Sequence, residues 1–137
     1  MVNNASGDTD KQCGDVIDKH SYPGPESPKP EKDRAAVLGE FGGLGLPIEG
    51  HTWSQKTWGY KDTKNMQDLT LGYEKLLEKS WFLNAESGLS AVIYTQLTDV
   101  ESECNGLMTY DREVRKISHE RGTAANTGKQ KGKALQN

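Results

Sequence analysis

Glu40 has the sequence context of a catalytic carboxylate. It follows the apolar run 35–38 and precedes the glycine-rich segment 42–45. A short apolar run of this kind is typical of a strand buried on both faces of a parallel sheet, and barrel enzymes carry their chemistry where such strands end. An unpaired carboxylate is costly there. We interpret Glu40 as a candidate catalytic residue, and a solvated glutamate in a turn is the alternative.

Four segments, taken in order, place Glu40 in a wider pattern. They are 15–25 (DVIDKHSYPGP), 36–47 (AVLGEFGGLGLP), 94–101 (YTQLTDVE) and 105–112 (NGLMTYDR). Together they resemble the catalytic domain of glycoside hydrolase family 2, most closely its bacterial β-galactosidase-like branch. The resemblance covers residues 2–116.

The resemblance implies a retaining β-glycosidase with an α/β fold, a (β/α)8 TIM barrel. Glu40 matches the family's nucleophile at the end of strand seven, and Tyr22 matches the tyrosine that hydrogen-bonds it. The family's acid/base glutamate lies at the end of strand four, before the position that corresponds to residue 1. The chain is therefore expected to be the C-terminal half of the barrel, about strands 5–8, over residues 1–118.

The resemblance also implies which substrate and which polypeptide partner the chain would have. The substrate would be a carbohydrate, a β-glycoside, and the chain would need a missing N-terminal half or self-association. No cofactor is expected. The parent protein would be periplasmic or secreted by resemblance. The alternative is a non-catalytic carbohydrate-binding or assembly module derived from such a barrel.

Three polar residues near the expected strand ends are candidates for substrate binding. Asn3 and Asn4 would end strand five by resemblance and face the sugar, although an ordinary loop fits them equally well. His20 lies at the end of the expected strand 15–20, where it could contact a sugar hydroxyl or serve a structural role.

The loop that follows Glu40 offers aromatic and imidazole groups. His51 and Trp53 are the substrate-binding candidates within residues 51–60, which also hold a second tryptophan and a tyrosine. Aromatic faces suit the C–H surfaces of sugars. Anchoring of the loop onto the protein is the alternative for these side chains.

Gln96 and Asp99 are the last two candidates. They lie at the carboxyl end of the expected strand 89–97, which is rich in β-branched residues. Many family members have a tryptophan near this position that forms the floor of the sugar pocket. The sequence here reads Tyr-Thr-Gln, so the nature of the floor stays open.

The remaining elements position these side chains. Residues 62–87 have apolar side chains at helical spacing and a glycine directly afterwards, so we predict a helix. Residues 22–30 hold four of the five prolines, which predicts a stiff loop. From residue 119 to 137 the chain is polar and basic, and we expect a disordered tail.

Composition excludes several classes of protein. The chain has 137 residues, whereas a complete barrel typically needs about 250. Its net charge of −3 and lack of a long apolar run argue against a nucleic-acid or membrane partner. Cys13 and Cys104 are expected to be free thiols, and a disulfide between them is the alternative. With the three histidines they form no metal-ligand spacing, so no structural metal is expected.

Overall fold

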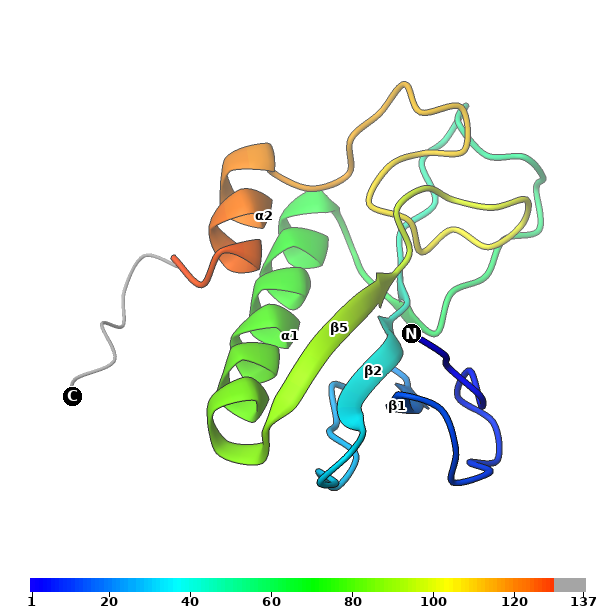
Figure 1. Ribbon diagram of the computed structural model, residues 1–137. Coiled ribbons are helices and arrows are strands. Elements are labelled where there is room, and N and C mark those ends of the chain that lie inside the picture. Colours follow the sequence, from blue (N-terminus) through cyan, green and yellow to red (C-terminus); the bar gives the residue numbers. More distant parts are fainter. Residues whose placement is uncertain (130–137) are drawn as a thin grey trace.

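The computed structural model describes residues 1–129. They form two helices and a few short parallel strands (Figure 1). In chain order the elements are β1 (Val16–Ser21), β2 (Ala35–Gly42), β3 (Leu44–Gly45), β4 (Lys61–Asp62), α1 (Met66–Ser87), β5 (Leu89–Thr95) and α2 (His119–Asn126). The main sheet has the order β1-β2-β5, all parallel, and β3 pairs with β4 in a separate two-stranded sheet.

The long helix α1 begins and ends where its sequence provides caps. The Asn65 side chain accepts a hydrogen bond from the backbone N–H of Asp68 (2.9 Å), which satisfies one of the free donors of the first turn. Gly88 closes the helix with φ 68°, a left-handed conformation that glycine adopts without strain. The predicted helix is confirmed, with a start four residues later than expected.

The cap at Asn65 gives a direct test of helix stability. Asn65→Ala is expected to lower the free energy of unfolding by about 1 kcal/mol, because the Asp68 N–H loses its acceptor. Urea denaturation measures this loss. Gln67→Ala is the matched control, since Gln67 is exposed on the same turn and caps nothing. Equal stability of the two variants would contradict the role of the cap.

The hydrophobic core lies between α1 and one face of the main sheet. Leu69, Tyr73 and Leu77 recur every four residues on the buried side of α1. Leu38 and Phe41 from β2 are fully buried against Tyr73 and Leu77, whereas Leu69 packs in a second cluster with Leu44 and Leu46. Val92 of β5 also packs against the Leu38 and Phe41 cluster.

The expectation of half a (β/α)8 barrel is wrong. Within residues 1–129 the main sheet has three strands, and α1 forms a single β-α-β crossover between β2 and β5. The prolines of residues 22–30 keep the connection from β1 to β2 free of helix. Residues 2–3 form no strand, and Val2 is instead tied to Asp15 through both its N–H and its carbonyl.

The segment that follows residue 118 differs from the expected tail in its first part. Residues 119–126 form α2, which begins at an N-cap serine, Ser118, and packs against α1. Three contacts join the helices: Tyr73 Oη donates to Asn126 Oδ1 (2.6 Å), Trp81 Nε1 donates to the Ala125 carbonyl (2.9 Å), and Arg121 binds Glu74 through two hydrogen bonds. The expected disorder of residues 130–137 lies outside the described residues.

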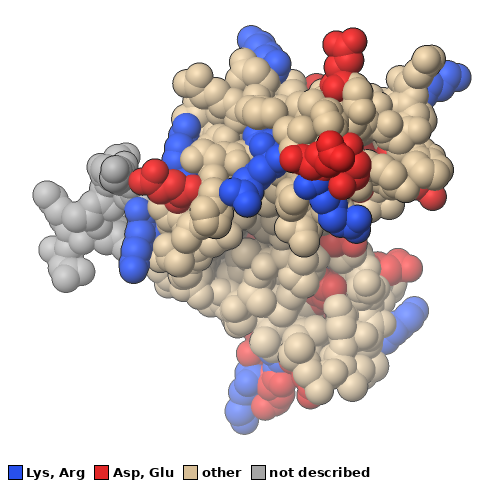
Figure 2. Space-filling view, turned by 90° about the horizontal axis from the view of Figure 1, so that it is seen from above, with Lys and Arg blue, Asp and Glu red and all other residues tan. Residues whose placement is uncertain are grey.

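The main sheet has β1 and β5 at its edges. Acidic and basic side chains alternate over the face of the molecule toward which the strands point (Figure 2). Within residues 1–129, no helix combines the length and apolar character that a bilayer crossing requires.

Candidate functional site

The carboxyl ends of β1 and β2 bring His20 and Glu40 together. The strands are parallel neighbours, and His20 is the register partner of Glu40. Both ladders are irregular here, with register shifts at Lys19/His20 and between Leu38 and Phe41. The shift in β2 turns Phe41 into the core and leaves the Glu40 side chain 43% exposed. Glu40 thus belongs to the strand, two residues before its end.

Tyr22 holds one oxygen of the Glu40 carboxylate. Its hydroxyl donates a hydrogen bond of 2.6 Å to Glu40 Oε2. Burial, together with this hydrogen bond, raises the pKa of Tyr22 well above its usual range. The phenol therefore stays protonated and remains a donor at every physiological pH. The contact predicted between Tyr22 and Glu40 is present in the structure.

His20 lies between Glu40 and a second carboxylate, Asp18. Its Nδ1 is 3.3 Å from Glu40 Oε2, and its Nε2 is 3.6 Å from Asp18 Oδ2. Asp18 is buried and receives hydrogen bonds from the Asn3 side-chain amide (2.5 Å) and the Gly39 N–H (2.8 Å). Asn3, Asp18, His20, Glu40 and Tyr22 therefore form one continuous polar network, which we call the Glu40 network.

Two glycines make room for the Glu40 network. A Cβ on Gly39 would lie 2.2 Å from Asp18 Oδ1, and a Cβ on Gly7 would lie 2.2 Å from Cγ of the His20 ring. Gly7 also has φ 78°, which a larger residue adopts only with strain. The backbone at Gly39 and Gly7 therefore lies so close to the Asp18 and His20 side chains that a larger residue at either position would clash with them.

An aromatic wall borders the Glu40 network. The rings of Tyr22 and Tyr60 stack with centroids 3.7 Å apart and planes 3° from parallel, and Trp58 packs edge-on against Tyr60. Trp58 and Tyr60 are each about half exposed. Partly exposed aromatic rings next to a carboxylate can contact the C–H surface of a sugar ring.

Within residues 1–129, the contacts to the Glu40 carboxylate all involve one oxygen. Both Tyr22 and His20 face Oε2, and no residue of the described range 1–129 hydrogen-bonds Oε1. A carboxylate held through one oxygen keeps the other for attack on an electrophile. The same geometry would suit a general base.

Gln96 and Asp99 lie in a different environment from the one expected. The Gln96 amide donates to Asn105 Oδ1 (2.8 Å), and a cis peptide bond joins Thr95 to Gln96. The Asp99 carboxylate has no exposed surface and pairs with the buried Lys116 at 2.6 Å. Asp99 therefore anchors the loop after β5 and has no surface to offer a sugar.

His51 and Trp53 form a second cluster with residues 109–113. His51 Nδ1 is 2.7 Å from Asp111 Oδ2, and the rings of Trp53 and Tyr110 lie 4.9 Å apart. The carboxylate of Glu113 completes a group of three that could hold a metal ion. Their contact with a substrate stays a prediction.

The structure places the two neighbouring asparagines in different environments, which the sequence interpretation did not distinguish. Asn3 contacts Asp18 and so belongs to the Glu40 network, whereas the Asn4 amide contacts Asp10 and Cys13. One further residue was missed. Asp18 is an acidic residue inside a buried strand, which is itself a sign of a paired group. Tyr60 belongs to the aromatic loop considered for sugar stacking, but its contact with Tyr22 could not be predicted, because Tyr22 is 38 positions earlier.

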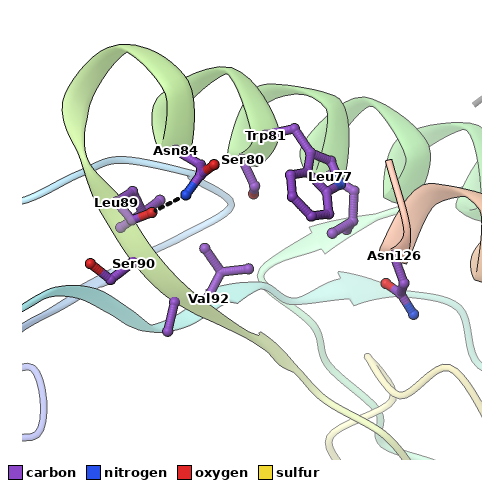
Figure 3. Close-up of a pocket in the computed structure, with 9 residues that line it drawn as sticks. Leu77, Ser80, Trp81, Asn84, Leu89, Ser90, Val92 and Asn126 are labelled. Atoms are coloured by element: carbon purple, nitrogen blue, oxygen red, sulfur yellow. Dashed lines mark hydrogen bonds between the residues drawn. The ribbon is translucent and has the colours of Figure 1, made fainter. Parts of the chain in front are cut away.

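A separate hollow lies between α1 and β5 (Figure 3). It has a volume of about 320 Å³ and is lined by Leu77, Ser80, Trp81, Asn84, Leu89, Ser90, Ala91, Val92 and Asn126. The one hydrogen bond drawn across it joins the Asn84 amide to the Leu89 carbonyl (2.8 Å). None of the lining residues has an ionisable side chain, so this hollow has no general acid or base, and its two serine hydroxyls donate to the backbone carbonyls of Leu76 and Gly88.

Comparison with protein-family models and with curated protein sequences finds no match to this chain. The resemblance to glycoside hydrolase family 2 therefore rests on the four sequence segments themselves.

Proposed function

We propose that this chain carries the nucleophile of a retaining β-glycosidase of the family 2 kind. Glu40 is the nucleophile, and the free Oε1 of its carboxylate is the observation that carries the proposal. In such a reaction one carboxylate attacks the anomeric carbon while a second carboxyl group, about 5–5.5 Å away, protonates the departing oxygen.

The neighbours of Glu40 have distinct roles in this proposal. Tyr22 orients the carboxylate through Oε2 and stays protonated throughout the reaction. His20 contacts the same oxygen and is itself held by Asp18. Tyr60 and Trp58 provide the aromatic surface on which the sugar ring stacks.

Asp18 is a poor candidate for the acid. Its carboxylate is buried and receives two hydrogen bonds, from the Asn3 amide and the Gly39 N–H. An acid must reach the glycosidic oxygen, which a buried side chain does not. We therefore propose that the acid comes from a second polypeptide or a further segment that binds next to the Glu40 network.

A covalent trap tests this function without the acid. The probes are 2,4-dinitrophenyl 2-deoxy-2-fluoro-β-D-galactoside and the corresponding glucoside, whose leaving group needs little protonation. The expected result is one fluorosugar ester per chain, located on Glu40 by peptide mass spectrometry. Absence of the ester, or an ester on Glu101 or Glu103, would overturn the assignment.

A non-catalytic carbohydrate-binding module is the second candidate function. The observation in its favour is the number of exposed aromatic side chains, among them Trp53, Trp58 and Tyr60. Such a module would bind an oligosaccharide in a titration followed by tryptophan fluorescence and would form no ester with the fluorosugar. The two readouts together separate the candidates.

A further inference from the structure

Three side chains from two distant loops meet at the surface outside the Glu40 network. His51 comes from the loop after β3, and Asp111 and Glu113 come from the loop before α2. One ligand atom from each lies within 4.8 Å of the other two. His51 and Asp111 are 60 positions apart, which is why no ligand spacing is visible in the sequence.

The loop that carries the carboxylates holds Asp111 in a fixed orientation. Asp111 Oδ1 accepts hydrogen bonds from the Thr109 hydroxyl (2.6 Å) and from the Glu113 N–H (3.1 Å). The remaining oxygen, Oδ2, faces His51 Nδ1 at 2.7 Å. Arg112 between the two acids has φ 64°, and this left-handed residue turns the chain so that both carboxylates reach His51.

Glu113 contributes a carboxylate that is otherwise unused. Among the described residues it has no hydrogen bond or ion pair through its side chain, and it is exposed. The cluster thus combines one imidazole with two negative oxygen ligands, and it opens to solvent for an entering ion.

We propose that His51, Asp111 and Glu113 form a binding site for a divalent transition-metal ion, with Zn²⁺ as the best match. Imidazole nitrogen suits zinc, whereas calcium and magnesium prefer sites made entirely of oxygen. In a tetrahedral zinc site two ligand atoms lie roughly 3.4 Å apart, since each bond is about 2.0–2.2 Å. The ligand atoms here lie within 4.8 Å of one another, so rotation of the exposed Glu113 side chain must bring its carboxylate closer to the other two ligands.

A bound ion would join two loops that already touch through Trp53 and Tyr110. It would replace the hydrogen bond between His51 and Asp111 with two metal bonds and leave coordination positions for water. The ion-binding assignment competes with the predicted contact between His51 and a sugar. It does not depend on the role of Glu40, which lies in a separate network.

Calorimetric titration with ZnCl₂ tests the site on the full chain in a Cys13→Ser background, because the exposed Cys13 thiol is a competing ligand. We expect saturable binding of one ion per chain. His51→Ala and Glu113→Gln should each weaken it at least about tenfold, the loss that follows from damage to a metal's surroundings. His119→Ala is the matched control, since His119 is another exposed histidine, at the start of α2.

Cobalt substitution gives a second readout. Co²⁺ bound by nitrogen and oxygen ligands absorbs weakly in the visible range, and the absorption should be lost in His51→Ala but kept in His119→Ala. Two results would overturn the proposal: binding of Zn²⁺ to His51→Ala as tight as to the parent chain, or no saturable binding below millimolar Zn²⁺. Circular dichroism of each variant checks that the loss of binding does not reflect loss of the fold.

Discussion

Replacement of Glu40 by glutamine is expected to abolish azide-supported cleavage of a dinitrophenyl β-glycoside by this chain. In the proposed reaction the Glu40 carboxylate attacks the anomeric carbon and dinitrophenolate leaves, which needs no acid. Hydrolysis of the ester then requires a base to activate water, so steady-state turnover without azide should stay near background. Azide needs no deprotonation, so it releases the sugar as the β-azide and regenerates the carboxylate.

Glu40→Gln removes the attacking charge but keeps the shape of the side chain. The azide-dependent rate should fall to that of the uncatalysed reaction, a loss of roughly 10⁴-fold or more if the nucleophile acts as in other covalent mechanisms. Glu49→Gln, at an exposed position, is the control and should leave the rate unchanged. An α-azide product from the parent chain would contradict the covalent mechanism, since it would indicate direct displacement without a Glu40 ester.

Tyr22→Phe separates orientation from attack in the same assay. The variant keeps the ring that stacks on Tyr60 but loses the hydroxyl that holds Glu40 Oε2. We expect the azide-dependent rate to fall by about 10²–10³-fold, the usual effect of removing one precisely placed donor. The β-azide should remain the product.

Lys116→Met is expected to have the largest effect on stability. The Lys116 ammonium is fully buried and donates to Asp99 Oδ1 (2.6 Å) and to the carbonyls of Leu46 (2.8 Å) and Cys104 (3.1 Å). Removal of the ammonium leaves the Asp99 carboxylate buried without a counter-charge. Breaking such a pair costs about 3–5 kcal/mol, and urea denaturation at pH 7 measures the loss.

The pH dependence of the stability loss in Lys116→Met tests whether the unpaired Asp99 carboxylate causes it. Burial already raises the pKa of Asp99 in the native protein, and Lys116 opposes that rise. Without Lys116 the folded-state pKa should rise further above the unfolded value. A raised carboxyl pKa means that the folded state binds the proton more tightly, so the penalty of Lys116→Met should shrink as the pH falls from 7 towards 4.

Two controls accompany Lys116→Met. Lys75→Met changes an exposed lysine on α1 and should alter the free energy of unfolding by no more than about 0.5 kcal/mol. The double variant Lys116→Met/Asp99→Asn removes both charges and should be more stable than Lys116→Met. A double variant no more stable than the single one would assign the loss to the two orphaned carbonyls instead.

Much of the secondary structure could be predicted from the sequence because it depends on local chemistry. The asparagine before residue 66 and the glycine after residue 87 define α1, and the apolar runs define β1, β2 and β5 to within a few residues. The barrel expectation failed because it required two elements that the chain does not form. Residues 2–3 are held by Asp15, and the prolines after β1 exclude a crossover helix.

The pairing of Glu40 with Tyr22 was expected from the sequence segments, whereas its surroundings were not. The parallel register of β1 and β2 places His20 beside Glu40, and the irregularity in β2 decides that Phe41, and not Glu40, faces the core. Asp99 illustrates the opposite outcome. Its place after a strand predicted a substrate contact, but Lys116, 17 positions later, buries it in an ion pair.

The sequence by itself determined α1, β1, β2 and β5 and the candidate nucleophile, because prolines, apolar runs, a terminal glycine and a carboxylate near a strand end act over a few neighbouring residues, whereas α2, β3 and β4 were not predicted. Only the tertiary structure decided which side chains meet. Tyr60 stacks on Tyr22, His51 meets Asp111, and Lys116 neutralises Asp99. Each pair joins residues that are distant in the chain or lie in loops without a periodic pattern, so their approach depends on how the sheet and α1 pack and not on local sequence.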